Sequence, residues 1–164
     1  MKIIHTSDWH FGRSQGTGSF AEDQRFFLDQ LCALIRTEQV QALLLCGDIY
    51  DSSVVSAEAI GLYNEAMTKL CLELGVQVIS IAGNHDSAPR LASCRELLKG
   101  AGLHITGKVN RNPVPVLLDG GKVAVYSIPF FTRDEITALL PEKKEEAPLS
   151  LFDEAPEEEA AADE

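Results

Sequence analysis

Short apolar runs alternate with stretches of helical periodicity along the first part of the chain. A predicted strand over residues 3–7 begins with two apolar residues. Ala42 to Cys46 is an unbroken apolar run, which is typical of a strand buried on both faces. Between these runs, the apolar residues from Phe20 to Arg36 recur at helical spacing. We therefore predict a strand, a helix and a second strand in this order.

The same alternation continues to residue 106. We expect a helix from Ser56 to Leu74, which Gly75 ends, and a third strand from Val76 to Ala82. A short helix over residues 91–99 and a strand over residues 103–106 follow. Because crossover connections between successive strands are right-handed, this order predicts that the first strands form a parallel sheet.

The pattern changes after residue 112. Strand patterns over residues 113–118 and 122–128 flank Asp119-Gly120-Gly121 and predict an antiparallel hairpin. Thr132 or Asp134 can cap a last helix that ends near Leu140. The predicted fold class is α/β, with a parallel βαβαβ unit followed by an antiparallel hairpin.

Charge divides the chain into two parts. The 164 residues carry a net charge of −11, from 25 acidic and 14 basic side chains. Residues 142–164 contribute −8 of this charge, which leaves −3 for residues 1–141. We expect one domain over residues 1–141 and an acidic linker or disordered tail over residues 142–164. The small charge of the domain does not exclude a polyanionic substrate.

The cysteines and the apolar runs indicate the compartment. The four cysteines, at positions 32, 46, 71 and 94, have neither a C-x-x-C pair nor zinc-type spacing, which favours reduced thiols and a cytoplasmic location. No apolar run reaches the roughly 18 residues that a membrane-spanning helix needs. We therefore expect neither secretion nor a role at a membrane.

Three polar clusters follow the first three predicted strands, at the sheet edge where open α/β sheets bind ligands. Residues 8–10 (Asp-Trp-His) place a carboxylate and an imidazole two positions apart, so that both can approach one metal ion. In residues 47–51 (Gly-Asp-Ile-Tyr-Asp), Asp48 can bridge two cations. Residues 83–86 (Gly-Asn-His-Asp) offer an amide oxygen and an imidazole beside an acid.

Each cluster also has a purely structural interpretation. Asp8 fits a turn, His10 fits an exposed histidine, and residues 83–86 fit a polar loop. Asp51 fits a capping residue as well as it fits an acceptor beside a metal ligand. The three clusters nevertheless occur in order, each after a predicted strand, which favours a metal centre over three coincidences.

The set D-x-H, G-D-x-x-D and G-N-H-D resembles the first three motifs of the calcineurin-like metallophosphoesterases. Residues 5–12, 82–87 and 127–130 resemble the bacterial SbcD-type nuclease subunits, and the resemblance covers residues 1 to about 133. It implies a layered β-sandwich flanked by helices. It also implies an exonuclease and endonuclease for double-stranded DNA ends and hairpins, which acts in DNA repair, recombination and replication.

By position, the resemblance implies two divalent metal ions, Mn²⁺ or alternatively Mg²⁺, Fe²⁺ or Zn²⁺. Asp8 and His10 would bind the first ion, Asp48 would bridge the two, and Asn84 would bind the second. The resemblance assigns His85 to the leaving oxygen, which it would stabilise or protonate, and assigns Asp86 to fixing that imidazole. It further implies a homodimer that works with an SbcC-type SMC-like ATPase subunit.

The family completes its site with later histidines, one on a later strand and others in a G-H-x-H motif. This chain has histidines at 5, 10, 85 and 104 only, and both His5 and His104 fit packed or surface residues. We therefore interpret the chain as the N-terminal part of a longer nuclease, with little or no activity by itself. The alternatives are another phosphatase or small-molecule phosphodiesterase, and a non-catalytic dimerisation or DNA-holding module.

Two packing expectations accompany this interpretation. Without a second sheet, the apolar faces near Val116, Leu118, Val123 and Val125 should be partly uncovered. The helix over residues 56–74 could pair with its copy in a dimer, although we expect most of its apolar residues to pack in the core.

Overall fold

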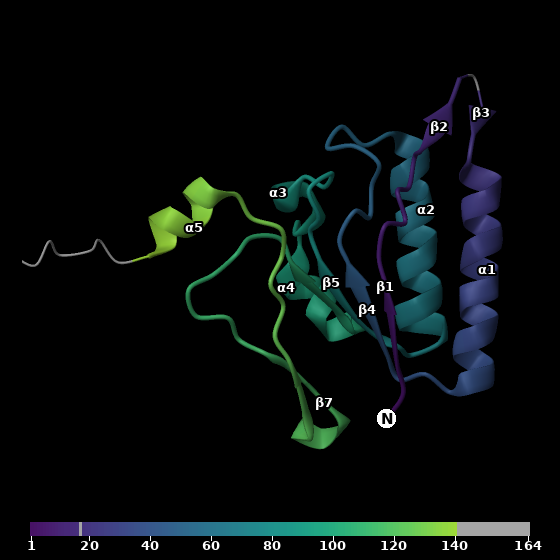
Figure 1. Cartoon of the computed structure of the whole chain (residues 1–164). Coiled ribbons are helices and arrows are strands. Elements are labelled where there is room, and N and C mark those ends of the chain that lie inside the picture. The colour runs from purple at the N-terminus through teal and green to yellow at the C-terminus, as the bar shows by residue number, and fades with distance from the viewer. Residues whose placement is uncertain (17, 141–164) are drawn as a thin grey trace, which may run out of the picture.

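The computed structural model describes residues 1–16 and 18–140. Within them, a four-stranded parallel sheet has the order β1-β4-β5-β6 (Figure 1). Its strands are β1 (Ile3–Thr6), β4 (Ala42–Cys46), β5 (Gln77–Ile81) and β6 (Leu103–Thr106). Thr6 pairs with Leu45, Leu45 with Ser80, and Ser80 with Ile105, so the carboxyl ends of the strands meet at one edge. The predicted parallel unit is confirmed.

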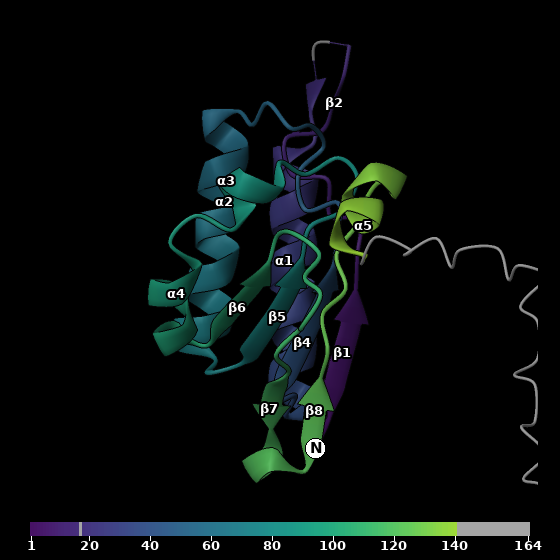
Figure 2. The ribbon, with the colours of Figure 1, turned by 90° about the vertical axis from the view of Figure 1, so that its left-hand side faces the viewer.

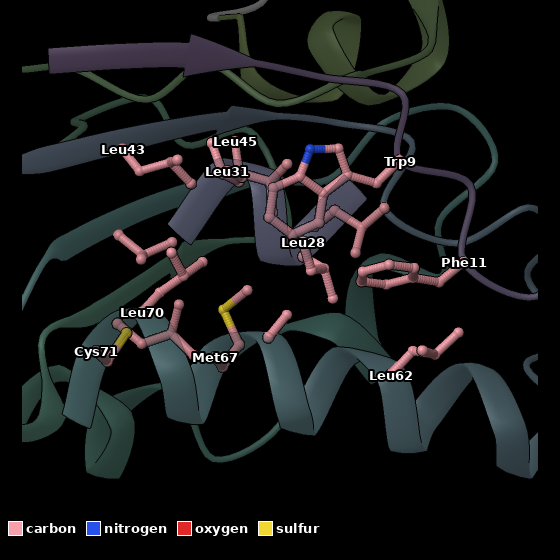
Figure 3. Packing of buried hydrophobic residues seen from close by; sticks show 14 of the residues in the cluster. Trp9, Phe11, Leu28, Leu31, Leu43, Leu45, Leu62, Met67, Leu70 and Cys71 are labelled. Carbon is pink, nitrogen blue, oxygen red and sulfur yellow. The ribbon is translucent and has the colours of Figure 1, made fainter. Parts of the chain in front are cut away.

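Two long helices cover one face of this sheet (Figure 1). They are α1 (Ala21–Glu38) and α2 (Ala57–Met67), and a π-helical segment, η1 (Thr68–Glu73), continues α2. Because side chains alternate along a strand, Leu43 and Leu45 of β4 point to the helices and belong to one buried cluster with Leu28 and Leu62 (Figure 3). This cluster, which also contains Trp9 and Phe11, is the main core.

The opposite face of the sheet carries the predicted hairpin (Figure 2). Its strands are β7 (Val116–Leu118) and β8 (Val123–Val125), joined by the 3₁₀ turn η3 (Asp119–Gly121). Leu118 is buried against Ala42 and Ile79, and Val116, Val123 and Val125 are half-buried around it. The expectation of uncovered faces is thus wrong for Leu118. The large apolar side chains that are exposed between residues 116 and 128 are Leu117, Tyr126 and Ile128.

Two further elements differ from the predictions. The single helix expected over residues 91–99 is two short helices, α3 (Ala88–Leu91) and α4 (Arg95–Leu98), followed by the 3₁₀ turn η2 (Lys99–Ala101). Cys94 separates the two helices because its φ of +56° is left-handed and cannot continue an α-helix. A small hairpin of β2 (Ser14–Gln15) and β3 (Gly18–Ser19) was not predicted.

The last described element is α5 (Arg133–Leu139), which Thr132 caps as one of the two predicted residues. The expected acidic linker over residues 142–164 lies outside the described residues. The described helices are all too short or too polar to cross a membrane.

Candidate metal centre

Three loops meet at the carboxyl ends of β1, β4 and β5. We call them the first loop (residues 7–12), the second loop (residues 47–53) and the third loop (residues 83–87). The backbone of the first loop runs beside that of the second: the His10 N–H donates to the carbonyl of Asp48 at 3.0 Å, and the Phe11 N–H donates to that of Ile49 at 2.8 Å. The pairing of β1 with β4 therefore continues into the loops and brings the first two polar clusters together.

A group of three potential metal ligands results from this pairing. One ligand atom of each of Asp8, His10 and Asp48 lies within 4.8 Å of the others. Two carboxylates and an imidazole fit a divalent cation of the first transition series. Within the described residues, no other histidine, cysteine or acidic side chain joins this group.

The backbone of the group is unusual. Asp8, His10 and Asp48 have φ angles of +59°, +47° and +50°, in the left-handed region. Such conformations are uncommon outside glycine, cost about 1 kcal/mol or more each, and tend to gather at functional sites. Backbone hydrogen bonds from Asp8 to Gly47 and from His10 to Asp48 join the two loops at these residues.

The third loop is tied to the second through Asp48 and His85. The His85 N–H donates to Oδ1 of Asp48 at 3.1 Å. The Nδ1 atom of the His85 imidazole lies 2.9 Å from the carbonyl oxygen of Asp51, to which it donates as the protonated ring nitrogen. This hydrogen bond is the main cause that raises the pKa of His85 above its usual range. The ring is exposed, and within the described residues its Nδ1 atom, not its Nε2 atom, has a hydrogen-bond partner.

Asp86 has partners other than the expected one. Its carboxylate accepts hydrogen bonds from three backbone N–H groups, those of Gly83 at 2.8 Å, Tyr50 at 2.9 Å and Ile49 at 3.2 Å. The imidazole of His85 is held by a carbonyl group and not by this carboxylate. The difference has a simple cause, because N–H groups that leave a strand need acceptors and one carboxylate can satisfy several. Asp86 therefore fastens the second loop to the third.

Asp51 lies beside His10, as one of its two interpretations required. Its Oδ1 atom is 3.2 Å from Nδ1 of His10, a close electrostatic contact without the alignment of a hydrogen bond. The other ring nitrogen, Nε2, lies 3.7 Å from Oδ1 of Asp8. A carboxylate on the far side of a ligating imidazole fixes the ring and makes it more basic. Because the Asp51 carbonyl accepts the hydrogen bond of the His85 imidazole, Asp51 contacts both His10 and His85.

Gln24 is a supporting residue that sequence reasoning missed. It comes from α1, and its Nε2 atom donates to the carbonyl of His10 at 2.7 Å. No sequence signal identifies it, because the contact depends on how α1 packs against the first loop.

The remaining candidates lie outside the three-residue group. Asn84 is exposed in the third loop, next to His85. His5 is exposed on β1. His104 is half-buried on β6 with its Nε2 atom 3.0 Å from Oε1 of Gln77, and burial lowers its pKa.

Comparison with known sequences and structures adds three findings. Residues 1–157 match the family described as calcineurin-like phosphoesterase. Two curated proteins, each named as a subunit of the nuclease SbcCD, are similar to this chain: that of Staphylococcus saprophyticus is 36% identical over 143 residues and that of Staphylococcus epidermidis is 35% identical over 144. These alignments cover 87% and 88% of this chain but 38% of each relative. The crystal structure of Pseudomonas putida nuclease MPE aligns with 76% of this chain and 67% of its own, with 17% sequence identity and a TM-score of 0.42.

Proposed function

Because the chain belongs to the calcineurin-like phosphoesterase family, we propose that it is the metal-binding part of a nuclease that hydrolyses phosphodiester bonds in DNA. The observation that carries this proposal is the convergence of Asp8, His10 and Asp48 within 4.8 Å. The names of the two curated relatives, of which the chain spans 38%, favour a nuclease over other phosphoesterases.

The proposed roles follow the positions of the side chains. Asp8, His10 and Asp48 would hold a first divalent ion, and Asp48 and Asn84 would be the ligands of a second. Such ions, when bound, lower the pKa of a coordinated water and neutralise charge on the phosphate. Carboxylate, imidazole and amide donors together suit Mn²⁺, which we propose as the metal.

His85 is the proposed proton donor to the leaving oxygen. With Nδ1 donating to the Asp51 carbonyl, protonation of Nε2 creates a second N–H that can reach a substrate. The raised pKa of His85 keeps more of the imidazole protonated near neutral pH, which suits a general acid. Asp51 and Asp86 act as positioning residues, the first on the two histidines and the second on the two loops.

The proposed substrates are double-stranded DNA ends and hairpins, and the proposed role is in DNA repair and recombination in the cytoplasm, with an SbcC-type SMC-like ATPase as partner. Among the described residues, only Asp48 and Asn84 are assigned to the second ion. A carboxylate and an amide alone bind a transition metal poorly. We therefore propose that these 164 residues alone have little or no manganese-dependent nuclease activity.

We also propose that the chain forms a homodimer through the outer face of α2, η1 and α4. The expected core residues of this helical segment are buried, Leu62 and Leu70 fully and Met67 almost so. Three other large apolar side chains of α2, η1 and α4 are exposed: Ile60, Leu72 and Leu97. A second copy of the same face would cover them, as an isologous contact.

Calorimetric titration of the 164-residue chain with Mn²⁺ tests the metal site. We expect about one ion to bind per chain, because one group of three ligands is complete. Asp48→Asn should abolish this binding, whereas Asp23→Asn, which changes an exposed acid in the first turn of α1, should leave it unchanged. No detectable binding by the wild-type chain, or equal binding by Asp48→Asn, would overturn the proposed centre.

A cleavage assay tests the reaction. Labelled hairpin DNA is incubated with Mn²⁺ and excess protein, beside a chromogenic phosphodiester and a phosphomonoester. We expect at most slow cleavage of the DNA, and its loss in His85→Ala. Robust DNA cleavage that His85→Ala abolishes would overturn the proposal that the isolated chain has little nuclease activity. Hydrolysis of the phosphomonoester alone would overturn the proposed nuclease function.

A further inference from the structure

Positive charge is concentrated in one stretch of this acidic chain. Residues 87–118 contain five lysines and arginines and a single acid, Glu96, so they carry a net charge of +4 in a chain whose total is −11. The five bases lie on α3, α4, η2 and the loop after β6, which is the edge strand of the sheet beside β5. The charge distribution therefore sets this side apart from the rest of the molecule.

Three of the five bases line one groove. Arg95 and Lys99 come from the helical turns before β6, and Lys108 comes from the loop after it. The groove has a volume of about 220 Å³, and Val114, Val116 and Ser127 also line it. We call Arg95, Lys99 and Lys108 the basic groove.

The groove begins at the same sheet edge as the metal centre. Thr106, the last residue of β6, pairs with Ile81, the last residue of β5. Lys108 thus follows β6 at the level at which the third loop follows β5. Gly107 packs so closely on α3 that an added Cβ atom would lie 2.6 Å from the carbonyl oxygen of Ala88. The loop that carries Lys108 is therefore packed against the helix that begins two residues after Asp86.

Two cations of the groove, Arg95 and Lys99, share one exposed acid. Glu96 lies 3.1 Å from Nε of Arg95 and 2.7 Å from Nζ of Lys99, and the side chains of both bases are 51% exposed. Exposed ion pairs of this kind contribute little to stability, so a phosphate can replace the carboxylate as the partner of the two bases. Burial lowers the pKa of His104, which also lines the groove, and so disfavours its charged form. The groove thus has an excess of two positive charges.

We propose that the basic groove binds the sugar–phosphate backbone of DNA beside the phosphodiester that reaches the metal centre. The proposal rests on the proposed nuclease function for its choice of polyanion. Contacts of this kind fix the position of a nucleic acid without reading its sequence. They also offset the repulsion between a phosphate and the acidic side chains of the first two loops.

Fluorescence anisotropy with labelled hairpin DNA, in EDTA, tests this binding without cleavage. The variant carries Arg95→Gln, Lys99→Gln and Lys108→Gln. We expect its dissociation constant for the DNA to rise about tenfold at 50 mM salt. The plot of the logarithm of the association constant against the logarithm of the salt concentration should become less steep by about 2 to 3, because about 0.9 counterions are released per phosphate contact. Glu96→Gln should do the opposite and tighten binding.

The control carries Lys2→Gln, Arg36→Gln and Lys122→Gln, which remove the same charge from the opposite end of the sheet. Circular dichroism melting confirms that each variant folds. Equal binding by the wild-type chain and the groove variant, equal losses in groove and control variants, or no DNA binding by the wild-type chain would each overturn the proposal. Because EDTA removes the metal, DNA binding is measured independently of cleavage. If the groove variant loses DNA binding but the chain hydrolyses only the phosphomonoester, the proposed nuclease function is wrong and the groove proposal stands. If the chain cleaves DNA but the groove variant binds DNA as well as the wild-type chain does, the groove proposal is wrong and the nuclease function stands.

Discussion

Gly47 and Gly83 are in direct backbone contact. A Cβ atom added to Gly47 would lie 2.8 Å from the Cα atom of Gly83, closer than real Cβ atoms approach any neighbour. In the other direction, a Cβ atom on Gly83 would overlap the backbone nitrogen and Oδ1 of Asp48. Two glycines thus bring the second and third loops close enough for Asp48 to accept the N–H of His85.

Gly83→Ala should therefore push these loops apart. We expect a loss of about 1–3 kcal/mol in the free energy of unfolding, which is typical of an overpacked site, and weaker Mn²⁺ binding. Urea denaturation and calorimetry measure the two effects. Gly61→Ala is the matched control: nothing lies within 4 Å of its added Cβ atom, and alanine within α2 should stabilise by about 0.5–1 kcal/mol. Unchanged stability and metal binding in Gly83→Ala would contradict the importance of this contact.

Asp86→Asn should also weaken the contact between the second and third loops. The carboxylate accepts three N–H groups, but an amide offers one oxygen and places its own N–H groups against the remaining donors. We expect a loss of about 1.5–3 kcal/mol, as for hydrogen bonds to a charged group. Chemical denaturation provides the measurement, with the exposed Asp134→Asn as control. If both variants unfold at the same denaturant concentration, Asp86 does not fasten the loops.

These residues show how far sequence reasoning reached. The unbroken run Ala42 to Cys46 predicted a central strand, and parallel order then placed Asp8 and Asp48 at one edge, as observed. The partners of Asp51 and Asp86 could not be predicted in the same way. Both bond to groups more than 30 residues away, several of them backbone atoms that carry no signature in the sequence. The interruption between α3 and α4 at Cys94 could not be predicted either, because the helical spacing of apolar residues does not indicate a single left-handed φ angle.

In the metal-free chain, the pKa values of His85 and His104 should lie on opposite sides of the usual histidine pKa of about 6.5. The hydrogen bond to the Asp51 carbonyl raises the pKa of His85, and burial lowers the pKa of His104. His85 therefore stabilises the fold below about pH 6.5, and this contribution is lost as the pH rises through its raised pKa. His104 opposes folding as the pH falls from about 6.5 towards its lowered pKa.

Proton NMR of the imidazole Cε1–H signals measures both values, and His85→Gln and His104→Gln assign the two resonances. Both signals moving together at about pH 6.5 would contradict the environments described for the two rings.

Leu97→Asp should dissociate the proposed homodimer. Leu97 is 81% exposed on α4, and a carboxylate there would be desolvated by the second copy. Light scattering after size exclusion should give the monomer mass for this variant at concentrations at which the wild-type chain is dimeric. Leu117→Asp, at a 62% exposed position on β7, should leave the dimer intact. A monomeric wild-type chain at high protein concentration would exclude the dimer altogether.

Asp51→Asn should separate the two contacts that Asp51 makes. Its side chain lies beside His10, whereas its carbonyl oxygen accepts the N–H of the His85 imidazole. Loss of the carboxylate removes the charge behind His10, and changes behind a ligating imidazole typically reduce metal affinity about 10–100-fold. The carbonyl stays in place, so the pKa of His85 should remain raised, because that hydrogen bond is its main cause. Calorimetry with Mn²⁺ and the NMR titration of His85 measure the two effects on one sample. A parallel loss of both would indicate that the second loop had collapsed, whereas unchanged Mn²⁺ affinity would leave Asp51 as a residue that orients His85 alone.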